Sequence, residues 1–122
     1  DAQARAFGVG WRMERVTGYP VLVNTRAETE FARRVATELV GAARVEPQTV
    51  ALSGSEDFAF MLEQVPGSYL LIGNGDGSDD GANGGHGACM VHNPGYDFND
   101  ANLPVGAAYW ALLVERFLSD AA

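Results

Sequence analysis

Two short motifs gather the residue types that could perform hydrolytic chemistry. The first reads Ser-Gly-Ser-Glu-Asp-Phe over residues 53–58, and the second reads His-Asn-Pro-Gly-Tyr-Asp-Phe-Asn-Asp over residues 92–100. Each motif places several groups that could contact a metal ion or a substrate in a turn just ahead of a predicted helix. The pair therefore indicates part of a hydrolytic metal site.

His92 is the strongest candidate for a metal ligand. It follows a short apolar segment and precedes Asn93-Pro94-Gly95, a rigid turn that would fix the imidazole in place. A neutral imidazole is the commonest protein ligand for zinc-like metals. Asp97 and Asp100 could support the ligand through hydrogen bonds, or they could cap the helix that follows. A histidine satisfied within a core is the alternative interpretation of His92.

Gly54, Ser55 and Glu56 are candidate substrate-binding residues. A tight turn at Gly54 and Ser55 could present backbone N–H groups to an anionic substrate group, with Glu56 at the wall of the pocket. A structural interpretation also accounts for Glu56, because a carboxylate at a helix start complements the positive end of the helix dipole. His86 is a weak candidate, since a flexible glycine-rich stretch could not hold a ligand in advance of binding. No residue of this chain is predicted to be catalytic.

The composition excludes several classes of protein. The chain has 122 residues, which suits one domain, and its net charge of −8 argues against a nucleic-acid partner, which would need a basic face. No apolar run approaches the roughly 20 residues that span a bilayer. The single Cys89 cannot form an internal disulfide, which favours a cytoplasmic location.

The elements that must position these motifs are predicted to alternate between strands and helices. Period-two patterning predicts a strand over residues 7–13, and apolar runs predict extended segments over 19–23, 45–52 and 68–72. Helical spacing predicts helices over about 25–41, 56–64 and 102–118, the first with a capping box at Thr25 and Glu28. Residues 73–87 are predicted to form a surface loop. This order predicts an α/β layered domain.

Three segments closely resemble the M20 family of metallopeptidases and amidohydrolases. They are residues 54–59, residues 71–75 (Leu-Ile-Gly-Asn-Gly) and residues 92–100. The resemblance is to the branch that contains hippurate hydrolases, N-acyl-amino-acid deacylases and auxin-conjugate hydrolases. Residues 19–25 are similar to that family's crossing from its lid domain into its catalytic domain.

The resemblance implies a function and a domain organisation. Residues 1–24 would be the last strand of a lid domain that carries the dimer interface, and residues 25–122 would be the C-terminal half of a layered α/β zinc-peptidase-like catalytic domain. The full enzyme would be a homodimer with two divalent metal ions per subunit, zinc or manganese. It would cleave the amide bond of small N-acyl or N-aroyl amino acids through a metal-activated water. His92 would be the last metal ligand, and Gly54, Ser55 and Glu56 would lie beside the substrate.

The remaining metal ligands and the general-base glutamate of that family have no match in this sequence. A catalytic metal needs about three protein ligands, and a hydrolase also needs a general base. We therefore expect the chain to be a C-terminal segment that is inactive by itself. Two alternatives remain open, namely a non-catalytic α/β module for binding or dimerisation, and a plain structural domain.

Overall fold

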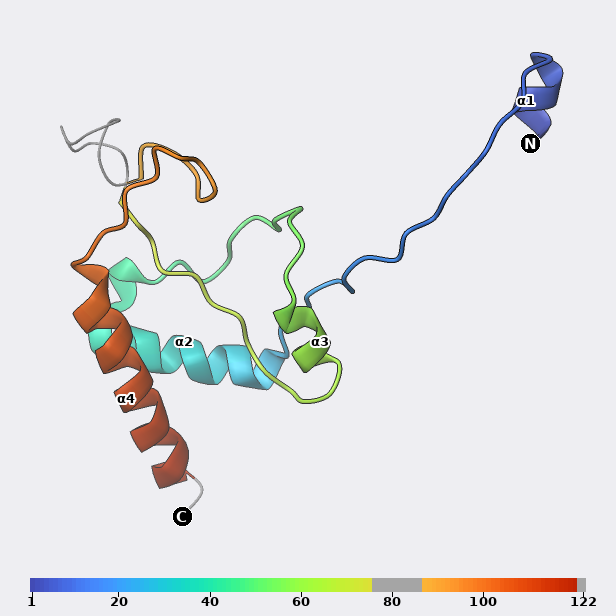
Figure 1. The fold of residues 1–122 in the computed structure, drawn as a ribbon. Coiled ribbons are helices and arrows are strands. Elements are labelled where there is room, and N and C mark those ends of the chain that lie inside the picture. Colours follow the sequence, from blue (N-terminus) through green and yellow to red (C-terminus); the bar gives the residue numbers. More distant parts are fainter. Residues whose placement is uncertain (76–86, 121–122) are drawn as a thin grey trace.

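The computed structural model describes residues 1–75 and 87–120, and within them all regular elements are helices (Figure 1). Extended segments and turns connect these helices. In chain order they are α1 (Ala2–Ala6), α2 (Arg26–Val40), the short 3-10 helix η1 (Ala42–Arg44), α3 (Phe58–Leu62) and α4 (Asn102–Asp120).

Helices α2 and α4 pack against each other and form the centre of the molecule. Apolar residues recur at helical spacing along α2, so that one face of the helix can be buried. On that face Ala32 and Val35 are buried, with 5% and 2% of their surface exposed. The hydroxyl of Tyr109 on α4 donates to the carbonyl of Ala32 over 3.3 Å. The helix pair thus depends on a small core of close contacts.

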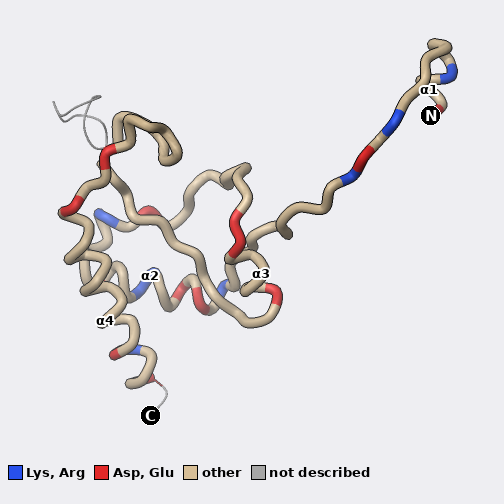
Figure 2. The backbone as a smooth tube through the Cα atoms, in the orientation of Figure 1, with Lys and Arg blue, Asp and Glu red and all other residues tan. Residues whose placement is uncertain are grey.

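Aromatic and charged contacts also join α2 to α4. The rings of Phe31 and Phe117 meet edge to face, with centroids 6.3 Å apart. Arg116 binds the Glu38 carboxylate with two nitrogens, and the Nε–Oε2 distance is 3.0 Å. The hydrogen bond from Arg116 holds the pKa of Glu38 below its ordinary value. Acidic and basic residues are interspersed along α2 (Figure 2).

The α/β prediction is wrong for the described residues, because none of them forms a strand. Segments predicted as strands are extended, but no neighbouring backbone pairs with them, and a strand exists only as part of a hydrogen-bonded ladder. Their side chains are consequently exposed. Examples are Val50 at 86%, Leu71 at 64% and Met13 at 71% of their surface.

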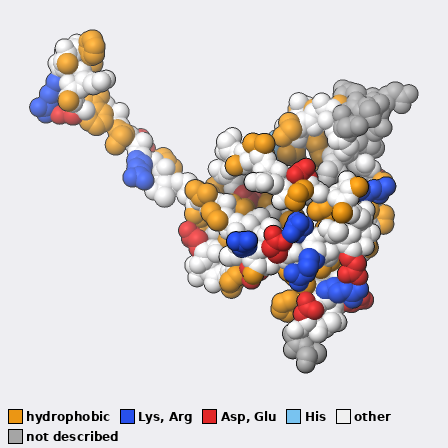
Figure 3. Space-filling view, turned by 180° about the vertical axis from the view of Figure 1, so that it is seen from behind, with side chains coloured by type: hydrophobic (Ala, Val, Ile, Leu, Met, Phe, Trp, Pro, Cys, Tyr) orange, Lys and Arg blue, Asp and Glu red, His pale blue; other side chains and the backbone are white. Residues whose placement is uncertain are grey.

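Residues 1–24 form an arm that projects away from the helices (Figure 1). The arm begins with α1, which the sequence analysis did not predict, and continues as an extended chain. Its large apolar side chains are exposed, and Figure 3 shows hydrophobic side chains along it. The indole Nε1 of Trp11 donates to Asp1 within the arm over 3.1 Å. Where the arm meets the rest of the protein, the centroid of the Tyr19 ring lies 5.6 Å from that of the Phe60 ring.

The three predicted helices are confirmed, with small changes at their ends. Pro104 lies in the first turn of α4 as expected, where its missing N–H is tolerated. Helix α3 is shorter than predicted, and Thr25 makes no side-chain cap on α2. Most of the predicted loop over 73–87, including His86, lies outside the described residues. No described helix has both the length and the apolar character needed to cross a membrane.

Candidate functional site

The turn at residues 54–57 is joined to α3 through Glu56. The backbone N–H of Phe58 donates to Glu56 Oε1 over 3.2 Å, and that of Ala59 donates to the Glu56 carbonyl over 3.2 Å. These bonds satisfy N–H groups at the helix start that have no partner within the helix. The N–H of Phe58 is the largest cause of a lowered pKa for Glu56, followed by a hydrogen bond from the Tyr69 hydroxyl. The Glu56 carboxylate is therefore occupied by its own helix and by Tyr69.

Tyr69 links this turn to the extended segment that follows α3. Its ring lies 5.7 Å from that of Phe58, and its hydrogen bond with the Glu56 carboxylate raises the pKa of the phenol. Gly54 and Ser55, on the other side of Glu56, are exposed. The geometry thus leaves the turn of Gly54 and Ser55 accessible while Glu56 holds it in place.

The same extended segment is fastened to the start of α2 by two polar residues. The carboxamide of Asn24 pairs with the backbone of Tyr69, accepting from its N–H over 2.7 Å and donating to its carbonyl over 2.9 Å. The Thr25 hydroxyl accepts from the Gly67 N–H over 2.7 Å, and it donates to the Gly67 carbonyl over 2.8 Å. The Thr25 N–H also donates to the Gly67 carbonyl. This junction uses the hydroxyl that the capping-box pattern assigned to the helix.

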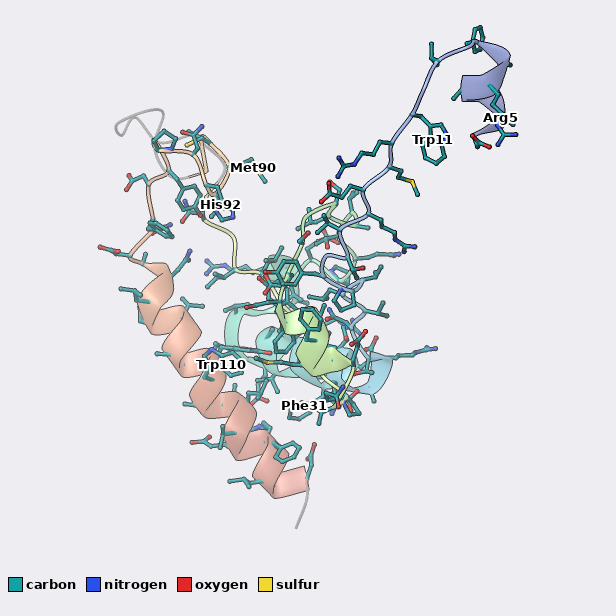
Figure 4. All side chains as sticks on the ribbon, turned by 45° about the vertical axis from the view of Figure 1, so that its right-hand side comes forward. Arg5, Trp11, Phe31, Met90, His92 and Trp110 are labelled. Atoms are coloured by element: carbon teal, nitrogen blue, oxygen red, sulfur yellow. The ribbon has the colours of Figure 1, made fainter. Side chains whose placement is uncertain are left out.

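His92 lies in the His92 loop, which we define as residues 87–101, just ahead of α4 (Figure 4). Hydrogen bonds from the Asn93 N–H to the Met90 carbonyl and from the Tyr96 N–H to the Asn93 carbonyl form two turns around it. His92 itself adopts a φ of 73°, which makes it the one non-glycine residue with positive φ in the described part of the chain. Left-handed backbone is unfavourable for L-residues with a Cβ, and such strained residues cluster at functional sites. The imidazole is exposed, so it is available to a ligand.

Asn74 connects the His92 loop to the Leu-Ile-Gly-Asn-Gly segment. Its Nδ2 donates to the Asp97 carbonyl over 2.6 Å, and its Oδ1 accepts from the Asn99 N–H over 2.9 Å. The Asn99 carboxamide donates in return to the Asn74 carbonyl over 3.4 Å. Three residues further along, at the start of α4, the Asn102 side chain donates to the Gly73 carbonyl over 2.8 Å. The segments over residues 71–75 and 92–100 are thereby held side by side.

A hollow of about 440 Å³ lies where these two motifs meet the first turns of α4. Its lining is mainly apolar, with Ile72, Phe98 and Leu103 among the lining residues, and it also includes the polar side chains of Asn74, Asp100 and Asn102. Gly106 adds little bulk to the helix wall.

Among the described residues, the structure joins two of the sequence motifs but does not join His92 to Gly54, Ser55 and Glu56. The motif at 92–100 meets the one at 71–75, but no hydrogen bond or ion pair joins His92 to the turn at 54–56 in the described residues. The predicted role of His92 as a metal ligand is consistent with its imidazole nitrogens and with its exposure. The described residues contain no group of three or more His, Cys, Asp and Glu able to hold a metal ion.

Sequence reasoning missed the three residues that hold the motifs in place. Asn24 and Asn74 act through backbone partners 23 to 45 residues away, and Tyr69 acts through the carboxylate of Glu56. The one signal for the two asparagines is positional, because Asn24 directly follows the apolar residues 21–23 and Asn74 follows the apolar residues 70–72 after Gly73.

Known proteins resemble this chain over most of its length. The model of peptidase family M20/M25/M40 matches residues 8–116. An IAA-amino acid hydrolase ILR1-like 6 from Arabidopsis thaliana is 32% identical over 104 residues, covering 84% of this chain and 20% of the relative. Hippurate hydrolase from Campylobacter jejuni is 32% identical over 99 residues, covering 81% of this chain and 23% of the relative.

The chain thus spans about a fifth of the length of the curated relatives that it matches. No solved structure matches it. The family match extends over nearly the whole sequence and includes all three motifs at 54–59, 71–75 and 92–100. The chain belongs to peptidase family M20/M25/M40.

Proposed function

We propose that this chain forms part of a metal-dependent amidohydrolase that cleaves the amide bond of N-acyl or N-aroyl amino acids. The observation that carries the proposal is the family match over residues 8–116, together with relatives named for the hydrolysis of hippurate and of IAA-amino acids. In this proposal residues 1–24 end a lid domain and residues 25–122 contribute to the catalytic domain. The whole enzyme is a cytoplasmic homodimer, and this chain by itself is inactive.

His92 is the metal ligand in this proposal. Its exposed imidazole and its left-handed backbone conformation support that role, because strain of this kind persists where the surrounding structure requires it. A divalent metal pair, zinc or manganese, supplies a Lewis acid and an activated water when bound. The other ligands and the general base come from further residues of the full enzyme.

Gly54, Ser55 and Glu56 bind the substrate, and they do so in two different ways. Gly54 and Ser55 are exposed and present backbone groups to the substrate. Glu56 acts indirectly by supporting the turn, because its carboxylate already accepts hydrogen bonds from the Phe58 N–H and the Tyr69 hydroxyl. An amino-acid product carries a carboxylate, which is the kind of group that a turn rich in N–H donors can bind.

The test compares two variants of the same loop in the protein at its native length. His92→Asn removes the imidazole and introduces a residue type that tolerates positive φ, so it avoids the added strain of an alanine. Met90→Ala is the control, because Met90 is 75% exposed and lies two residues away. The readouts are bound zinc or manganese and the hydrolysis of N-benzoylglycine.

We expect His92→Asn to reduce metal-dependent hydrolysis by more than the roughly 10- to 100-fold that an outer-shell partner contributes, with Met90→Ala unchanged. Full metal-dependent activity in His92→Asn would refute the ligand assignment. A protein that forms dimers but shows no metal-dependent hydrolysis would favour the alternative function, a binding or dimerisation module. The exposed apolar side chains of the arm, such as Phe7 at 80%, are the observation that favours this alternative.

A further inference from the structure

The carboxamide of Asn74 takes the place of a peptide group between two segments. Its donor and its acceptor both have backbone partners in the His92 loop, the Asp97 carbonyl at 2.6 Å and the Asn99 N–H at 2.9 Å. A carboxamide has the same planar arrangement of donor and acceptor as the backbone, so one side chain can make the pair of bonds that adjacent strands would exchange.

These bonds connect the His92 loop to the rest of the protein. Three hydrogen bonds between Asn74 and the loop residues Asp97 and Asn99 join the loop to residues 71–75, and Asn102, which directly follows the loop, donates a fourth to Gly73. The bonds around His92 itself, between Met90 and Asn93 and between Asn93 and Tyr96, span three residues each. Such local bonds fix the shape of the turns, but they do not fix where the turns lie relative to the rest of the protein.

We propose that Asn74 is a positioning residue for the metal ligand His92, acting through the backbone of Asp97 and Asn99. This inference rests on the proposed function. Metal affinity requires that each ligand be held within about 0.5 Å of its working position by groups that are themselves fixed. Asn74 provides that support from a segment that Asn24 anchors at its other end through Tyr69.

Asn24 offers a matched control, because it makes the same type of bond on the same segment. Its carboxamide also pairs with one donor and one acceptor of a backbone, with distances of 2.7 and 2.9 Å. Removing either carboxamide deletes two comparable hydrogen bonds, but only Asn74 contacts the His92 loop. The two variants therefore separate a loss of general stability from a loss of ligand position.

The experiment measures zinc affinity by competition with a chelator, and thermal unfolding, in the protein at its native length. The variants are Asn74→Ala, Asn74→Asp, Asn24→Ala and His92→Asn. Asn74→Asp keeps the acceptor for the Asn99 N–H and loses the donor to the Asp97 carbonyl, so it remains informative if Asn74→Ala does not fold. We expect Asn74→Ala to weaken zinc binding about tenfold and Asn74→Asp to weaken it less. Asn74→Ala and Asn24→Ala should lower the unfolding temperature by similar amounts. Asn24→Ala, however, should leave zinc affinity unchanged.

The outcomes separate this inference from the proposed function. If His92→Asn leaves zinc affinity unchanged, the ligand assignment fails, and the role of Asn74 fails with it. If His92→Asn weakens binding while both Asn74 variants bind zinc as the wild type does, the ligand assignment stands and the positioning role is refuted. Equal losses of affinity in Asn74→Ala and Asn24→Ala would also refute it, since they would reflect stability alone.

Discussion

Replacing Thr25 by valine should destabilise the protein by breaking the junction between α2 and Gly67. Valine has nearly the shape of threonine but no hydroxyl, so the half-buried side chain keeps its volume. Two hydrogen bonds are lost, from the Gly67 N–H over 2.7 Å and to the Gly67 carbonyl over 2.8 Å. The carbonyl keeps the Thr25 N–H as a partner, whereas the Gly67 N–H loses its partner in the described structure.

The size of the effect follows from those two bonds. A typical hydrogen bond contributes about 1 kcal/mol, and a donor left without a partner in a partly buried place costs about 1 to 3 kcal/mol. We therefore expect the free energy of unfolding to fall by about 2 kcal/mol. Helix capping adds nothing to this figure, because the Thr25 side chain makes no cap hydrogen bond.

Urea denaturation followed by circular dichroism measures this change. Thr25→Ser, which keeps the hydroxyl, should retain most of the stability. Thr37→Val on the same helix is the control, since the Thr37 hydroxyl makes no hydrogen bond in the described residues, and it should change stability by less than about 0.5 kcal/mol. A Thr25→Val protein that is as stable as Thr37→Val would refute the importance of the junction.

Two further predictions concern Glu56 and the helix core. The pKa of Glu56 is lowered from 4.5, mainly by the Phe58 N–H, so its ionised form stabilises the folded state above pH 4.5 and this stabilisation is lost as the pH falls through the lowered value. Glu56→Gln should therefore unfold at a lower temperature than the wild type at pH 7, with the difference closing at more acidic pH; a difference independent of pH would contradict the assignment. Val35→Ala should lower the free energy of unfolding by about 1.5 to 2.5 kcal/mol, because it removes two buried carbons and leaves a cavity. In urea denaturation Val114→Ala, at a site 53% exposed on α4, should have almost no effect, and equal losses in the two variants would argue against the core at Val35.

The sequence predicted the helices because helical periodicity is a local property. The spacing of Phe31, Val35 and Leu39 identifies the buried face of α2 without knowledge of its partner. A period-two pattern such as that of residues 7–13 shows only that an extended segment could bury one face. Whether it becomes a strand depends on a neighbouring backbone, and in the described residues none pairs with it.

The site residues were predicted to different extents for a similar reason. The motif at 92–100 and the family resemblance pointed to His92, and the family is confirmed. The roles of His92, Gly54, Ser55 and Glu56 remain predictions. The contacts of Asn74 could not be predicted, because its partners Asp97 and Asn99 lie 23 and 25 residues away and an asparagine near the end of an apolar run is equally typical of an ordinary turn.

The left-handed backbone at His92 has a consequence for anyone who evolves this protein in the laboratory. At a φ of 73° glycine is free of the steric penalty that histidine bears, a difference of about 1 kcal/mol. A selection for heat resistance alone should therefore enrich glycine at this position. Under the proposed function, each such gain in stability would be accompanied by a loss of activity. Libraries screened for both properties at once should retain histidine there, and the contrast between the two screens would reveal how far stability and catalysis compete at a single residue.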